Sequence, residues 1–171
     1  MTISEVLLQD FDAEMASTRR LLERVPDEKA DFKPHDKSFA LGKLAMHVAT
    51  LPFFGKTILS EPGMDMKAPK TPFPDNTFRS RDTLLSTFAT SSAQCRDALA
   101  SLSDAELQQP WRFAFGEHVV SQAPRSLSYR TMFFNHFLHH RGQVVVYLRL
   151  NNIPVPGLYG PSADEPFNPG R

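Results

Sequence analysis

The stretch Ser126–Leu150, SLSYRTMFFNHFLHHRGQVVVYLRL, decides the fold of this chain. It contains no proline and no acidic residue, and its apolar residues recur at three- and four-residue intervals. This spacing predicts one long helix, which ends at Asn151 and Asn152. At 100° per residue, one stripe of that helix carries six side chains: Tyr129, Phe133, His136, His140, Val144 and Tyr147.

Three further segments show the same helical period, at about residues 3–25, 39–59 and 81–102. Ser80 is a suitable N-cap for the third, and residues 103–106 have the capping-box form of a short helical turn. Pro52 lies inside the second, where we expect a kink or a break. Residues 111–120 alternate only loosely, which is compatible with a small hairpin or an extended excursion.

Four long helices predict an all-α protein, a four-helix bundle. The longest connection, residues 61–79, joins the second helix to the third and is rich in proline. Loops of this length in compact proteins are often functional. Residues 154–171 are also proline-rich, so we expect an extended tail. The length of 171 residues suits a single domain spanning residues 1–171.

Composition excludes several classes of protein. The chain has 19 basic and 19 acidic residues, so it lacks the excess of cations that a nucleic-acid surface requires. Its one cysteine, Cys95, excludes an internal disulfide and fits a reducing compartment. No run approaches the roughly 20 apolar residues of a membrane span, and residues 1–5 do not begin a signal peptide. We therefore expect a cytoplasmic protein without a membrane partner.

The histidines carry the chemistry. His136 and His140 lie one helical turn apart, about 40° from each other, so their ring nitrogens can converge on one ion. His47 lies on the apolar face of the second helix, between Leu44 and Leu51. A single core histidine is more often packing than a ligand. However, residues 126–150 offer no acid to pair with buried rings, which favours a metal held by all three in the bundle interior.

Other familiar sites are absent from the sequence. It contains no His-Glu-x-x-His zinc-protease motif, no Glu-x-x-His motif of a carboxylate-bridged di-iron bundle, and no glycine-rich phosphate loop. Cys95 falls on the apolar stripe of the third helix, where filling the core is its expected role.

Three motifs together resemble the DinB-like family: LGKLAMHVA at 41–49, NHFLHHRGQ at 135–143 and PVPGLYGPSADE at 154–165. The resemblance implies an up-down-down-up four-helix bundle, often a homodimer, with one divalent ion bound by His47, His136 and His140. Zinc or nickel is the first expectation for that ion and iron a further one. Some members of the wider family are S-transferases or isomerases that use low-molecular-weight thiols.

Three neutral histidines leave coordination positions open, which is the pattern of catalytic rather than structural metal sites. We therefore expect an enzyme that activates water or a small thiol, of the hydrolase or S-transferase type. His139 and Gln143 are candidates for supporting the ligands, and Tyr129 and Tyr147 for orienting a substrate. The alternatives are a non-catalytic metal- or ligand-binding stress protein and a structural bundle within a larger assembly.

One feature bears on oligomeric state. Phe134, Leu138 and Val145 lie on the opposite side of the last helix from the histidines, and a helix that is apolar on both sides is buried on both. The tail or a loop can cover that second face, and so can a second copy of the chain. We predict a homodimer. Arg141 is expected either to pair with an acid between helices or subunits or to remain solvated.

Overall fold

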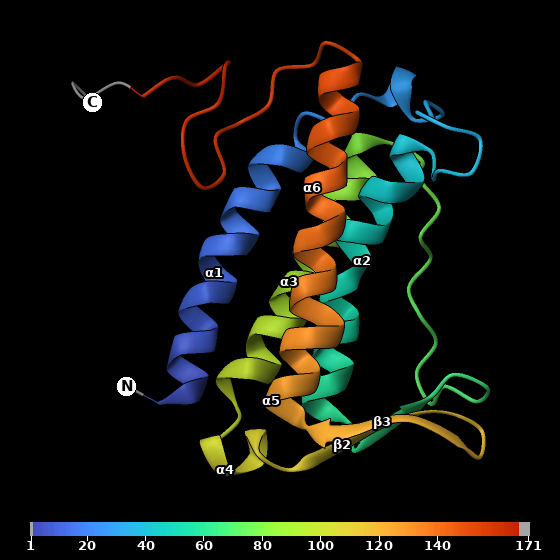
Figure 1. Ribbon diagram of the computed structural model, residues 1–171, viewed down its shortest axis with the longest axis vertical. Helices are drawn as coiled ribbons and strands as arrows, with labels where there is room; N and C mark the ends of the chain where they lie inside the picture. The colour runs from blue at the N-terminus through green and yellow to red at the C-terminus, as the bar shows by residue number, and fades with distance from the viewer. Residues whose placement is uncertain (1, 168–171) are drawn as a thin grey trace.

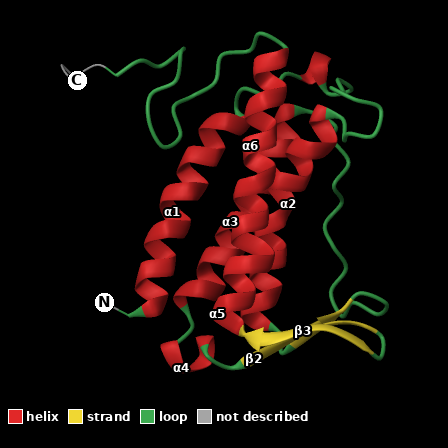
Figure 2. Ribbon diagram, in the orientation of Figure 1, coloured by secondary structure: helices red, strands yellow, loops and turns green. Residues whose placement is uncertain are grey.

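The computed structural model describes residues 2–167, and over these residues the chain is mostly helical with a small three-stranded sheet (Figure 2). Four long helical stretches lie alongside one another, and the first and last run opposite to the middle two (Figure 1). They are α1 (Ile3–Leu22), α2 (Leu41–Ser60), α3 (Arg81–Ala100) and a last stretch made of α5 (Arg125–Ser128), a π-helical segment (Tyr129–Phe134) and α6 (Asn135–Leu150). A 3-10 turn (Asp27–Lys29) and α4 (Asp104–Leu107) are short.

The helix ends follow from local capping chemistry. The Ser80 side chain accepts a hydrogen bond from the Thr83 amide, which confirms its predicted role as the N-cap of α3. Ser103 and Glu106 form the predicted capping box at α4. Of the kink or break predicted at Pro52, the break does not occur, because α2 is helical from Leu41 to Ser60. The kink stays a prediction. Pro52 is buried, so packing of α2 against its neighbours compensates for the missing backbone donor.

The sheet corrects the all-α prediction. β1 (Gly63–Asp65) pairs in parallel with β2 (Pro110–Phe115), and β2 pairs antiparallel with β3 (His118–Pro124). The loosely alternating segment is therefore a hairpin, and it turns at Gly116 with φ at 61°. Asp65 accepts a 2.8 Å hydrogen bond from the Gly116 amide, which holds the turn against β1.

The loop that follows β1 and the C-terminal tail both pack on the helices. Residues 66–71 form turns and bends, and residues 72–80 then run in an extended path to the start of α3 (Figure 1). In the tail, Asp164 pairs with Arg149 at 2.6 Å and Glu165 with Arg20 at 2.5 Å. The tail contains no helix or strand as far as residue 167, but it folds back on itself instead of being extended, because the Asp164 and Glu165 carboxylates accept hydrogen bonds from the amides of Val155 and Gly157. Residues 168–171 lie outside the described part.

Arg141 pairs within the chain. Its buried guanidinium contacts the Glu14 carboxylate and the Tyr159 hydroxyl, and it donates a 3.2 Å hydrogen bond to the Thr18 hydroxyl. These contacts join α6 to α1 and to the tail.

The face that motivated the homodimer prediction is largely covered by the chain itself. Phe134 is buried against Tyr129, and Leu138 and Val145 are partly buried against the core. The homodimer therefore stays a prediction without support from this face. None of the helices within residues 2–167 combines the length and the apolar character that crossing a membrane requires.

Gly55 allows α2 to approach the last helical stretch closely. A Cβ atom at this position would lie 2.7 Å from the Phe133 ring and 2.9 Å from the Cys95 sulfur. Both neighbours are fully buried and cannot easily move away. The absence of a side chain at residue 55 thus sets how near α2, which carries His47, lies to the helix that carries His136 and His140.

We expect Gly55→Ala to destabilise the protein by about 1–3 kcal/mol, because overpacking a tight contact outweighs the gain in helix propensity. Gly142→Ala is the matched control, because Gly142 is also helical but a Cβ there meets nothing within 4 Å. That control should be neutral or more stable by up to about 1 kcal/mol. Urea unfolding of both variants measures the difference, and equal stabilities would contradict the close contact.

Candidate metal centre

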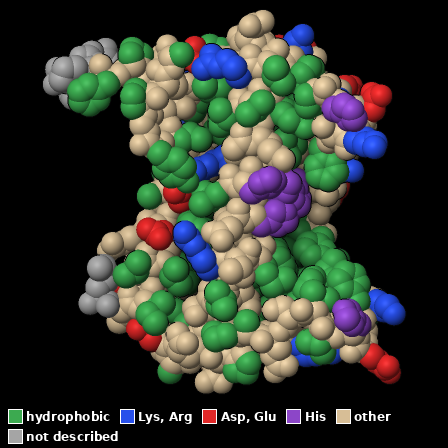
Figure 3. All heavy atoms as spheres, in the orientation of Figure 1, with side chains coloured by type: hydrophobic (Ala, Val, Ile, Leu, Met, Phe, Trp, Pro, Cys, Tyr) green, Lys and Arg blue, Asp and Glu red, His purple; other side chains and the backbone are tan. Residues whose placement is uncertain are grey.

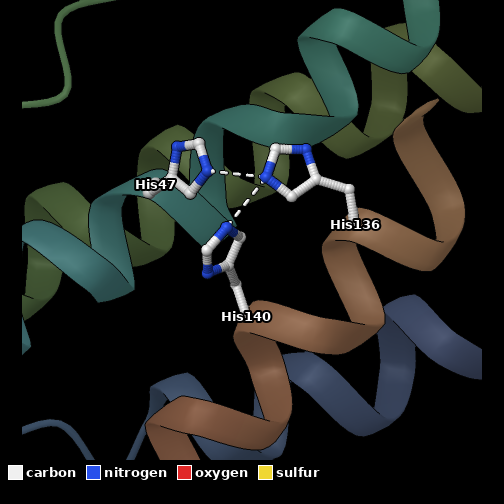
Figure 4. A group of neighbouring side chains, drawn as sticks. All are labelled: His47, His136 and His140. Atoms are coloured by element: carbon white, nitrogen blue, oxygen red, sulfur yellow. Dashed lines mark hydrogen bonds between the residues drawn. The ribbon is translucent and has the colours of Figure 1, made fainter.

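Three imidazoles from two helices meet at one point (Figure 4). His47 comes from α2, and His136 and His140 come from successive turns of α6. The His136 Nε2 lies 3.3 Å from the His47 Nε2 and 2.8 Å from the His140 Nε2. Nitrogen ligands about 2.0–2.1 Å from a zinc ion stand roughly 3.3 Å apart in a tetrahedral site. The first separation matches this value and the second is shorter, so the cluster approaches the spacing of a shared transition metal.

The cluster lies at the edge of the core rather than in the bundle interior. All three histidines are only half-buried, and Figure 3 shows histidine side chains gathered on the surface in the middle of this face. On α6 the buried stripe runs through Phe137, Arg141 and Val144. His136 and His140 occupy its flank, so the expectation of an interior site is wrong. The site is open to solvent on one side.

The π-helical segment explains part of this displacement. In an uninterrupted α-helix, Tyr129 and His136 are seven residues apart and share a face. A π turn contains one extra residue, which rotates everything after it by about 100° relative to what precedes it. Tyr129 is consequently fully buried against Phe133 and Phe134, away from the face that carries the histidines.

Hydrogen bonds orient two of the rings. The His140 Nδ1 lies 2.7 Å from the Gln143 Oε1, and an amide oxygen only accepts. The His140 Nδ1 therefore carries the proton, and its Nε2 presents a lone pair to the cluster. His136 also hydrogen-bonds to the backbone of Met132. Such partners fix the tautomer and the orientation of metal-binding imidazoles.

The environment keeps the rings neutral at neutral pH. Burial, followed by the proximity of His140 and His136, lowers the pKa of His47 to about 4. Burial is also the main cause that lowers the pKa values of His136 and His140, and the hydrogen bond from His140 to Gln143 partly opposes the effect. Metal ligation requires the unprotonated imidazole, so these shifts favour it.

The other candidate residues fall in different places. His139 is exposed, with its ring centroid 5.0 Å from that of His140. Tyr147 and Gln143 line a cavity of about 270 Å³ on the His140 side, which also contains Lys37 and Ser38. Cys95 is fully buried, and burial raises the pKa of its thiol, as expected of a core residue.

A second cavity, of about 330 Å³, opens beside His47 and His136. Its walls come from α2, from the loop after β1, and from β2, and they include Phe54, Phe73 and Phe113. From the sequence, residues 61–79 were predicted to be a long loop, but none of the three phenylalanines in these walls was predicted to be part of the site. Only contacts between distant segments bring the loop and the hairpin to the histidines.

Comparisons with known proteins agree with this architecture. The family model of the DinB superfamily matches residues 10–144. The protein YrdA of Bacillus subtilis, which is described as uncharacterized, is 28% identical over 159 residues, covering 92% of this chain and 89% of the relative.

Two solved structures are similar as well. A DinB-like protein from Bacillus cereus superposes with a TM-score of 0.67 at 25% identity, covering 92% of this chain and 98% of that one. The DinB-like protein YjoA from Bacillus subtilis has a TM-score of 0.65 at 18% identity and covers 86% of this chain and 94% of its own, which shows the fold alone.

The lowered histidine pKa values predict a pH dependence of stability for the metal-free protein. Unfolded histidines bind protons near pH 6.5, whereas folded His47 does so only near pH 4. The unfolded state thus takes up more protons between these values, so stability is complete above about pH 6.5 and falls as the pH drops toward 4. Thermal melts should show a smaller fall for His47→Gln than for the wild type. The control His118→Gln, on β3, should show the same fall in melting temperature as the wild type. Equal falls for all three proteins would contradict the lowered pKa of His47.

Proposed function

Because this chain belongs to the DinB superfamily, we propose that its three converging histidines bind one divalent transition metal, and that the protein is a metal-dependent enzyme. Zinc or nickel is the proposed ion, with iron as a further candidate, since neutral imidazoles suit all three. The observation that carries the proposal is the convergence of three Nε2 atoms, with the Nδ1 of His140 held by Gln143.

The position of the site favours catalysis over storage. A structural zinc site is closed by four protein ligands, whereas His47, His136 and His140 are the only group of three or more potential ligand residues found within residues 2–167. They are half-exposed and adjoin two cavities. These cavities would let a reactant reach the ion, which a closed storage site does not allow.

The residues around the histidines bear on the reaction. When bound, an ion of this kind lowers the pKa of a water ligand to about 7 or holds a thiol as its thiolate. No Asp or Glu lines either of the two cavities, so the described residues offer no carboxylate to take a proton there. This favours a nucleophile that is already close to losing its proton. A free thiol, with a pKa near 8.5, and a metal-bound water, with a pKa of about 7, both meet this condition. We therefore propose a small thiol or water as the nucleophile, which makes the protein an S-transferase or a hydrolase.

The proposal also covers the assembly of the chain. We interpret the four long helical stretches as an up-down-down-up bundle that forms one domain over residues 1–171, in agreement with the helix directions in Figure 1. The predicted homodimer and cytoplasmic location complete the proposal.

Metal titration tests the site. Chelator-treated protein without a purification tag should bind one Zn²⁺ or Ni²⁺ per chain in isothermal titration calorimetry. His140→Ala should weaken binding by about 100-fold or more, since loss of a ligand costs at least as much as loss of an outer partner. His118→Ala, an exposed histidine on β3, is the matched control and should bind as the wild type does. Full metal occupancy in a triple alanine variant at 47, 136 and 140 would refute the proposal.

Gln143 should contribute to metal affinity through His140. Gln143→Leu removes the acceptor at Nδ1, and we expect binding to weaken by about 10- to 100-fold. Gln143→Glu retains an acceptor in the same place and should restore most of the affinity. Equal affinities for the leucine and glutamate variants would show that the hydrogen bond has no part in binding.

A further inference from the structure

We propose that the cavity beside His47 and His136 binds an uncharged aromatic group of the substrate. The inference rests on the proposed function and names the class of molecule that the metal site acts on. We call this space the aromatic cavity. Its volume is about 330 Å³. It is lined by Thr50, Leu51, Phe54, Met66, Phe73, Pro74, Asn76 and Phe113 together with the two histidines.

Three phenylalanines from different segments shape the aromatic cavity. The Phe54 ring on α2 lies 6.4 Å from the Phe73 ring on the loop and 6.4 Å from the Phe113 ring on β2. Phe73 also contacts Phe53 at 6.3 Å, yet it remains 45% exposed. These rings meet at inclined angles, an arrangement that leaves ring faces and edges available to a further aromatic ring. A cavity of this size is at the small end of ligand sites and suits a single ring with short substituents.

The lining of the aromatic cavity disfavours charged ligands, because it contains no charged side chain. No Lys, Arg, Asp or Glu side chain lines the aromatic cavity. In the metal-free protein, a charged group entering it would lose its hydration without gaining a charged partner from the lining. The Thr50 hydroxyl already donates to backbone carbonyls of its own helix, at 3.0 Å and 3.2 Å. The Asn76 amide is the remaining polar group apart from the histidines, and it can orient one polar substituent.

The cavity beside His140 differs in character from the aromatic cavity. It contains Lys37, Ser38 and Gln143 beside His140, and it shares no lining residue with the aromatic cavity. A charged reactant thus has a more favourable approach from the His140 side. The cluster thus adjoins an apolar cavity at His47 and His136 and a more polar one at His140, which suits an apolar substrate and a polar second reactant.

Fluorine NMR tests the assignment on the full chain. The probe is 4-fluorotoluene, with 4-fluorobenzoate and 4-fluorobenzylammonium as charged counterparts of similar shape. On metal-free protein, we expect the uncharged probe to bind at least tenfold more tightly than either ion. Phe73→Asp should weaken its binding at least tenfold and Phe73→Ala about threefold or more. Phe167→Ala is the matched control, because Phe167 is 78% exposed in the tail and lines neither cavity. It should change binding less than twofold.

A second measurement locates the probe. Protein loaded with Co²⁺ should relax the fluorine signal of bound 4-fluorotoluene faster than protein loaded with Zn²⁺, because the aromatic cavity adjoins the histidines. Equal affinity for charged and uncharged probes would overturn the inference, as would unchanged binding in both Phe73 variants. Equal fluorine relaxation rates of bound 4-fluorotoluene in the Co²⁺- and Zn²⁺-loaded proteins would also overturn it.

Zinc titration of the same samples separates this inference from the proposed function. Probe binding without zinc binding refutes the metal site and leaves the aromatic cavity standing. Zinc binding without probe binding refutes the cavity assignment alone. The Phe73 variants should keep the zinc affinity of the wild type, because Phe73 is outside the histidine cluster.

Discussion

The close contact between α2 and the last helical stretch is the constraint on which the site depends. A glycine at position 55 lets the Phe133 ring sit against the backbone of α2, and this fixes the distance between the two helices that carry the imidazoles. The Nε2 atoms of His47 and His136 are 3.3 Å apart only because that distance is short. Positioning by rigid helices, rather than by loops, suits a site in which ligand spacing must hold to a fraction of an ångström.

Half-burial gives the histidines two properties that full burial would not combine. Partial removal from water, together with neighbouring rings, lowers their pKa values and keeps the nitrogens free of protons. The exposed side still lets a reactant approach. The bundle supplies the first property through α2 and α6, and the loop after β1 and the hairpin then shape the approach with Phe73 and Phe113. The loop after β1 and the hairpin are not part of the helical bundle, and they supply the walls of the cavity beside the histidines.

The sequence predicted the long helices within a few residues, because their apolar residues repeat with the helical period and Ser80 caps one of them. It also pointed to His47, His136 and His140, since one-turn spacing and placement on apolar faces are local properties. It did not predict β1, the π-helical segment or the aromatic cavity. Three-residue β1 carries no periodicity of its own and exists through its pairing with β2. Likewise, the π turn depends on packing around Tyr129 and Phe133, which residue spacing does not show. Spacing alone therefore could not predict which residues after the π turn share a face with Tyr129.

Contacts of Arg141 fix the orientation of α6 about its own axis. Its guanidinium is buried beside Thr18 and contacts Glu14 on α1 and Tyr159 in the tail. A buried cation is tolerated only with partners in fixed positions, so these contacts resist any turn of α6 about its axis. His140 immediately precedes Arg141, and such a turn would carry its Nε2 out of the cluster. On the α1 side the ion pair sets the angle of α6, and on the α2 side the contact at Gly55 sets its distance. Together they confine the imidazoles of α6 to the one arrangement that meets His47.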